Sequence, residues 1–206
     1  MSTSFFDCLD YDTAKDVELL SRAIYELRES RKRVLAETGY EDETSLFNAI
    51  REGAIAEHPA YELLLAARVM DQAREDARMA LRPEPGERPA HCLHAALCAT
   101  LEEKFAERIT APVELLQDAL RFMLDSGHEV TARFAADDAF SIEWREGDAI
   151  SRIDSAPNTT NGGQGAPHYH DATGELHSET PCDTSGAAED VMVSVVAYLL
   201  DASRGN

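Results

Sequence analysis

The amino-acid sequence predicts an α+β protein in which a long N-terminal helical hairpin precedes helices packed on a small three-stranded antiparallel sheet. Two observations predict this class. Apolar residues recur at helical spacings of three and four in successive segments of residues 13–127, and beyond residue 129 they alternate with polar residues. A last helical pattern at residues 187–202 completes the chain, so helices are expected to cover one face of the sheet.

The first part of the chain predicts three helices, at residues 13–38, 43–52 and 58–82. The first has an apolar stripe that includes Leu20 and Leu27, and Gly39 supplies its stop. The third begins at His58-Pro59, because proline is favoured in the first turn of a helix. Its stripe is rich in alanine, and small residues let helix axes approach closely. The first and third helices are therefore expected to form an antiparallel pair.

Residues 83–89 hold three prolines and a glycine, which cannot continue a helix and are typical of a linker. This break predicts two domains, a helical hairpin at residues 1–82 and an α+β domain at residues 90–206. The second domain is expected to begin with two more helices, at residues 90–109 and 110–127.

Strands are predicted where the alternation is clear, at residues 130–134, 140–144 and 149–153. Trp144 lies on the apolar face of this pattern and is expected in the core. The polar segment at residues 158–186 is expected to be a long, mobile loop and a contact site rather than core. A hairpin is an alternative within it, with residues 171–174 as its turn.

The charge of the chain limits its partners. The formal net charge is −20, and only three basic residues accompany the 13 acidic ones in residues 129–190. This balance argues against direct contact with a nucleic-acid backbone or an anionic membrane. It predicts docking on a basic protein partner, with Asp137, Asp138 and Glu143 as candidate contacts. Solubility, or adaptation to a salty host, is the alternative explanation of the acidity.

The sequence contains no phosphate-binding loop, dinucleotide fingerprint, zinc-protease motif or nucleophile elbow. Two groups of histidines are left as candidate metal ligands, because imidazole and thiolate bind zinc and copper. His94 and Cys98 share one helical face, and His168, His170 and His177 lie in the polar loop. The alternatives are that His94 and Cys98 belong to the core and that the loop histidines are solvated.

These observations favour a non-enzymatic acidic regulator, adaptor or inhibitor that binds a basic protein, with no cofactor expected. Two alternatives stay open: a metal-binding protein or metal-dependent enzyme that uses the His-rich loop with zinc or another transition metal, and a nucleic-acid-mimicking inhibitor. A homodimer is a further alternative. The N-terminal residues lack a signal peptide and no apolar run could span a bilayer, so a cytoplasmic protein is expected.

Overall fold

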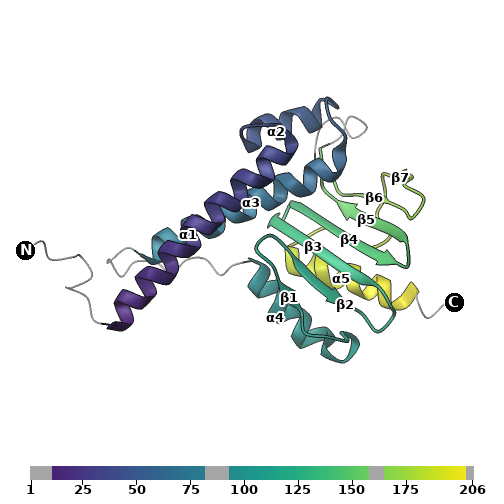
Figure 1. The fold of residues 1–206 in the computed structure, drawn as a ribbon. Coiled ribbons are helices and arrows are strands. Elements are labelled where there is room, and N and C mark those ends of the chain that lie inside the picture. Colours follow the sequence, from purple (N-terminus) through teal and green to yellow (C-terminus); the bar gives the residue numbers. More distant parts are fainter. Residues whose placement is uncertain (1–10, 82–92, 158–164, 203–206) are drawn as a thin grey trace, which may run out of the picture.

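The computed structural model describes residues 11–81, 93–157 and 165–202, and within them helices and an antiparallel sheet form one mixed fold (Figure 1). The α-helices are α1 (Tyr11–Thr38), α2 (Glu43–Arg51), α3 (Glu57–Ala80), α4 (Leu93–Phe105) and α5 (Ala188–Ala202). The strands are β1 (Glu114–Leu115), β2 (Leu120–Met123), β3 (Glu129–Ala136), β4 (Ala139–Glu146), β5 (Ala149–Asp154), β6 (His168–His170) and β7 (Leu176–His177). The predicted α+β class is confirmed.

The predicted helical hairpin is also confirmed, because α1 and α3 lie side by side and run in opposite directions (Figure 1). Gly39 ends α1 with φ +77°, a conformation that side chains with a Cβ rarely adopt. Asp42 then caps α2 by accepting a hydrogen bond from the Ser45 amide at 2.8 Å. Leu64 and Leu65 of α3 are fully buried, because α3 packs against α1 and α2 and also against the sheet.

The prediction of three strands is wrong: the sheet has seven antiparallel strands, in the order β1-β2-β3-β4-β5-β6-β7. The three predicted strands are its centre, β3, β4 and β5, where the alternation is longest. The other four strands have only two to four residues each. Such short segments carry too few positions for an alternating pattern to appear in the sequence.

The predicted helix at residues 110–127 is wrong as well, because β1 and β2 occupy this segment. Leu120 and Phe122 are buried, whereas Arg121 and Met123 between and after them are exposed, which is a period of two. β2 pairs with β3, so its backbone groups are satisfied by the sheet rather than within a helix.

The hairpin within the polar segment is confirmed: β6 pairs with β7, and the Gly174 amide donates to the Asp171 carbonyl at 2.9 Å across the turn. The segment is partly buried, since His168 is only 3% exposed. Residues 158–164 lie outside the described residues, and the mobility of the segment stays a prediction.

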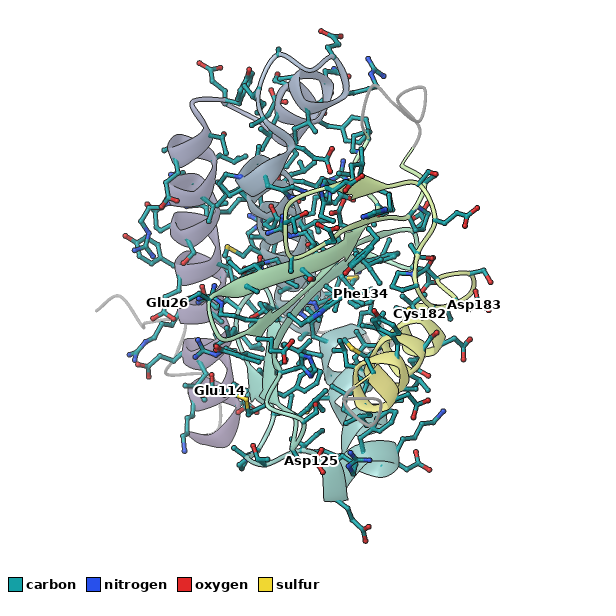
Figure 2. The ribbon with its side chains drawn as sticks, turned by 90° about the vertical axis from the view of Figure 1, so that its right-hand side faces the viewer. Glu26, Glu114, Asp125, Phe134, Cys182 and Asp183 are labelled. Atoms are coloured by element: carbon teal, nitrogen blue, oxygen red, sulfur yellow. The ribbon has the colours of Figure 1, made fainter. Side chains whose placement is uncertain are left out.

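The two faces of the sheet are covered by different helices. One face is apolar and packs on α4 and α5; Phe134, which Figure 2 labels, belongs to this layer, and so does Trp144, as predicted. The opposite face meets α3, which contacts β3 and β4, and the small residues Ala135, Ala139 and Ala156 pack there against the hairpin. Polar side chains of β4, β5 and β6 share this second face.

The predicted linker at residues 83–89 lies outside the described residues, and the division into two domains stays a prediction. Among the helices that the structure describes, none combines the length and the apolar character needed to cross a membrane.

Candidate metal centre

A block of polar side chains lies on the face of the sheet that meets α3. Asp154 of β5 pairs with His168 of β6, and Arg152 pairs with His170. Residues directly opposite each other in an antiparallel pair point to the same face, as do residues two apart in one strand. Two strands therefore place a carboxylate, a guanidinium and two imidazoles together on a face that α3 covers.

The start of α3 closes over this block. His58 has extended backbone angles (φ −108°, ψ 138°), so the regular helix begins at Pro59, as the sequence predicts. Two hydrogen bonds fix the first regular turn to the sheet: Tyr61 Oη lies 3.1 Å from Ser155 Oγ, and Ser141 Oγ donates to Glu62 Oε1 at 3.2 Å. These contacts hold the residues that precede the turn above β5 and β6.

Four side chains, those of Glu57, Asp154, His168 and His170, each place one donor atom in a group whose members all lie within 4.8 Å of one another. Glu57 Oε1 is 2.8 Å from His168 Nε2 and 3.2 Å from His170 Nε2. Asp154 Oδ1 is 3.3 Å from His168 Nε2. The side chains of Asp154 and His168 are 0% and 4% exposed, so this group lies deep between α3 and the sheet.

His58 points at the same centre. Its Nε2 is 3.2 Å from Glu57 Oε1, 3.2 Å from His170 Nε2 and 3.4 Å from Asp154 Oδ2. Its other ring nitrogen, Nδ1, is 2.8 Å from Glu62 Oε1. One imidazole edge of His58 therefore faces Glu57, Asp154 and His170, and the other faces the buried carboxylate of Glu62.

The hydrogen bond at the far side of the His168 ring decides which of its nitrogens carries a hydrogen. Nδ1 lies 3.0 Å from the Ala166 carbonyl oxygen, which can only accept a hydrogen bond. Nδ1 is therefore an N–H. Without a metal ion Nε2 can also carry a proton and donate to Glu57, and when the ring is neutral the lone pair of Nε2 points at the centre. A histidine that binds a metal ion is commonly held in this way by a carbonyl or a carboxylate.

Two opposing effects set the protonation of the residues at this centre: burial disfavours their charged forms, and close partners of opposite charge favour them. Burial disfavours the charged form of Glu57, but hydrogen bonds from His168, His170 and His58 outweigh it and lower the pKa of this carboxyl. Burial likewise opposes the charged form of His58, but hydrogen bonds to Glu57 and Glu62 raise its pKa to about 9. Burial raises the pKa of Asp154. A cation among these carboxylates is therefore favoured, whether it is a proton on imidazole or a metal ion.

Two buried carboxylate oxygens have no hydrogen-bond partner in the part of the chain that the structure describes, Asp154 Oδ2 and Glu62 Oε2. The other oxygen of Asp154 accepts from the Ala156 amide at 2.9 Å, which holds the carboxylate in place. A buried carboxylate oxygen without a partner is costly, and coordination to a metal ion is one way in which such a group is satisfied.

Arg152 closes the polar block on the side away from the donors. Its Nε lies 3.1 Å from Glu62 Oε1, and its Nη2 donates to Glu143 Oε2 at 2.5 Å. Burial disfavours the charged form of Glu62, but the His58 hydrogen bond and charge, followed by the charge of Arg152, lower its pKa. His58 and, to a smaller extent, Arg152 thus favour the ionised form of Glu62.

Of the predicted metal ligands, the structure brings His168 and His170 together and leaves the others elsewhere. His94 Nε2 accepts a hydrogen bond from the Phe134 amide at 3.1 Å, on the apolar side of the sheet. Cys98 lies 3.8 Å from a carboxylate oxygen of Glu102 on its own helix. His177 lies 3.0 Å from Asp171.

His177 also belongs to a second group of potential ligands, with Asp171 and Glu175. Asp171 Oδ1 accepts hydrogen bonds from the amides of Thr173 at 2.8 Å and Glu175 at 3.0 Å, which is the pattern of a residue that closes a turn. The closeness of Asp171, Glu175 and His177 is therefore explained by the turn of the β6–β7 hairpin.

The predicted partner contacts lie at two places. Asp137 and Asp138 form the exposed β3–β4 turn that the sequence indicates, and Asp137 also accepts from the Ala188 amide at the start of α5, at 2.9 Å. Glu143 lies in the polar block, bonded to Arg152. Docking on a basic protein, nucleic-acid mimicry and a homodimer all concern a second molecule, and they stay predictions.

Sequence reasoning missed Glu57, His58, Glu62 and Asp154. A partial signal was present, because the order Arg152-Ile153-Asp154 puts two charged residues on the face opposite the apolar one. No local pattern joins this strand to Glu57 and His58, which lie about a hundred residues earlier in the chain.

Comparison with known proteins adds no assignment, since the chain matches no protein-family model, no curated protein and no solved structure.

Proposed function

We propose that this protein binds one divalent transition-metal ion through Glu57, Asp154, His168 and His170. The observation that carries the proposal is the convergence of these four donor atoms, each within 4.8 Å of the others, at a buried point between α3 and the sheet. An ion bound at ~2.1 Å holds neighbouring donors ~3.0 Å apart at a right angle and ~3.4 Å apart at the tetrahedral angle. The contacts of 2.8, 3.2 and 3.3 Å, the last of them to Asp154 Oδ1, are close to these separations, and His170 Nε2 lies 3.9 Å from Asp154 Oδ2.

The donor set indicates the class of ion. Imidazole suits zinc, iron, copper and nickel, whereas carboxylate also suits manganese and magnesium. Two imidazoles with two carboxylates therefore favour a first-row transition metal of intermediate character, such as zinc, iron(II) or manganese. Glu57 and Asp154 together carry two negative charges, which one divalent ion neutralises in a site where unpaired charge is costly.

The ion would also join distant parts of the chain. Glu57 belongs to the helical hairpin, whereas Asp154 belongs to β5 and His168 and His170 belong to β6. A ligand that binds only the folded state stabilises that state. We therefore expect the ion to hold α3 against β5 and β6.

Elemental analysis of the purified protein, followed by calorimetric titration of the metal-free protein with Zn²⁺, Mn²⁺ and anaerobic Fe²⁺, tests the proposal. One ion per chain is expected. His168→Ala should weaken binding by more than the ~10–100-fold that loss of an outer partner of a metal ligand costs. His177→Ala is the matched control, because this histidine lies outside the four-donor group, and it should bind like the parent.

Failure of all three ions to bind at one equivalent would overturn the proposal. Equal loss of affinity in His168→Ala and His177→Ala would overturn the assignment of the ligands.

A further inference from the structure

We infer that His58 is a fifth ligand of this centre, oriented by Glu62, and that the resulting shell of three nitrogens and two oxygens leaves one position for water or a small anion. The inference rests on the proposed metal site and adds its coordination number and the class of its exogenous ligand.

His58 is not one of the four residues whose donor atoms all lie within 4.8 Å of one another, but its Nε2 lies beside three of them, Glu57, Asp154 and His170. Its separations of 3.2 Å from His170 Nε2, 3.2 Å from Glu57 Oε1 and 3.4 Å from Asp154 Oδ2 fall in the ~3.0–3.4 Å range of neighbouring ligands on one ion. Asp154 Oδ2 is the buried oxygen that lacks a hydrogen-bond partner among the described residues. A metal ion among these atoms gives that oxygen and both histidine nitrogens a common partner.

Glu62 supplies what a ligating histidine needs on its other side. Its Oε1 is 2.8 Å from His58 Nδ1, and it is fixed by Ser141 Oγ at 3.2 Å and Arg152 Nε at 3.1 Å. Glu62 is 8% exposed, so solvent competes little for this hydrogen bond. A carboxylate on Nδ1 orients the ring and strengthens Nε2 as a donor. His168 has the equivalent partner in the Ala166 carbonyl.

Five protein donors favour an ion that accepts a larger shell than the tetrahedral one preferred by structural zinc. In an octahedral shell five donors leave one position. The side chains of Glu57, His58 and His170 are 17%, 20% and 18% exposed, whereas Asp154 is fully buried. The open position is therefore expected on the side of these three residues, and their small exposure favours water or a small anion over a large substrate.

The absorption spectrum of the Co²⁺-loaded protein tests this inference, because the visible absorption of Co²⁺ strengthens at each step as the coordination number falls from six to five and to four. The parent should give weak bands at one equivalent of Co²⁺. His58→Ala should still bind one equivalent but give stronger bands. Glu62→Gln, which keeps the size of the side chain, should lower the Co²⁺ affinity by ~10–100-fold. Sodium azide should shift the bands of the parent.

Thermal unfolding of the metal-free variants shows that each is folded, and His177→Ala should match the parent throughout. Identical Co²⁺ spectra for the parent and His58→Ala would overturn the role of His58 while leaving the four-donor site in place. Parent bands that azide does not change would overturn the exogenous ligand. Absence of Co²⁺ binding, together with absence of Zn²⁺, Mn²⁺ and Fe²⁺ binding, would overturn the proposed site itself.

Discussion

The two faces of the central sheet are formed by the same strands, yet one buries mainly apolar side chains and the other buries polar and charged ones. Ile142 and Ile153 are fully buried on the face that packs on α4 and α5. Their neighbours in sequence, Ser141 and Asp154, are equally buried on the opposite face, which α3 covers. A sheet of this kind commonly leaves its polar face to solvent. Here a helix covers that face too, so its polar groups must find partners inside the protein.

The two faces are therefore expected to have different roles: the apolar face stabilises the fold, and the polar face forms the candidate metal centre. Burial of apolar side chains stabilises the fold without any need for a partner. Burial of Asp154, Glu57 and Glu62 is unfavourable unless other groups compensate for their charge. The apolar face can therefore hold the sheet together on its own, whereas the polar face is expected to depend on its histidines, Arg152 and the proposed ion. Three predictions test this contrast.

The largest effect is expected on the apolar face. Ile142→Ala should lower the free energy of unfolding by ~2–5 kcal/mol, because it leaves a cavity in a fully buried layer. Its neighbour on the polar face gives the matched comparison: Ser141→Ala removes one hydrogen bond to Glu62 and should cost only ~0.5–1.5 kcal/mol. Denaturant unfolding of both metal-free variants measures the two losses. Equal losses would show that the two faces contribute alike.

The second effect is expected from the metal ion itself. A free metal concentration of 100 times the dissociation constant should raise the free energy of unfolding by ~2.7 kcal/mol. Ile142→Ala should gain as much as the parent does, because its cavity lies on the other face of the sheet. Asp154→Asn should gain much less at the same metal concentration, because a neutral amide replaces a charged ligand and raises the dissociation constant.

Asp154→Asn also tests whether Asp154 serves metal binding or the stability of the fold. In the metal-free protein this variant removes a charge that burial disfavours, so its unfolding free energy should not fall below that of the parent. A strongly destabilised metal-free Asp154→Asn protein would mean that the carboxylate serves the fold rather than an ion.

The contrast between the faces also explains what could be predicted from the sequence. Helical spacing predicted the hairpin and α5, and alternation predicted β3, β4 and β5, because each pattern is local and long enough to read. β2 was misread as helix because Leu116, Leu120 and Met123 recur at helical spacings of four and three, whereas the strand buries Leu120 and Phe122 and exposes Met123. Leu64 and Leu65 lie outside the single stripe expected for α3, because that helix packs on two sides.

The site was predictable only in part. His168 and His170 were predicted as ligands because histidines cluster in the polar segment, and β6 places both on one face of the sheet. Glu57 and His58 begin a helix far from them in sequence, where acidic residues are common. Only the packing of α3 across the polar face joins the two segments, and such a long-range contact leaves no local pattern.

The smallest expected effect concerns His94, the histidine on the apolar side of the sheet. Its Nε2 accepts the Phe134 amide hydrogen at 3.1 Å and so must be unprotonated in the native state. Burial lowers the pKa of His94; the charge of Asp118 opposes this shift and that of Arg133 adds to it. A histidine with a lowered folded-state pKa binds fewer protons in the native than in the unfolded state. Its contribution to stability is therefore complete above the unfolded pKa, ~6.5, and is lost as the pH falls through the folded value.

His94→Gln isolates this contribution from the histidines of the proposed centre, because those residues are common to both proteins. The amide oxygen of glutamine can accept the same hydrogen bond, so the variant should lose no more than ~1 kcal/mol at pH 8. The difference in unfolding free energy between parent and variant should then shrink or reverse as the pH is lowered from 7 to 5. Denaturant unfolding at fixed metal-free conditions over this range measures it, and a difference that stays constant with pH would show that His94 does not titrate on unfolding.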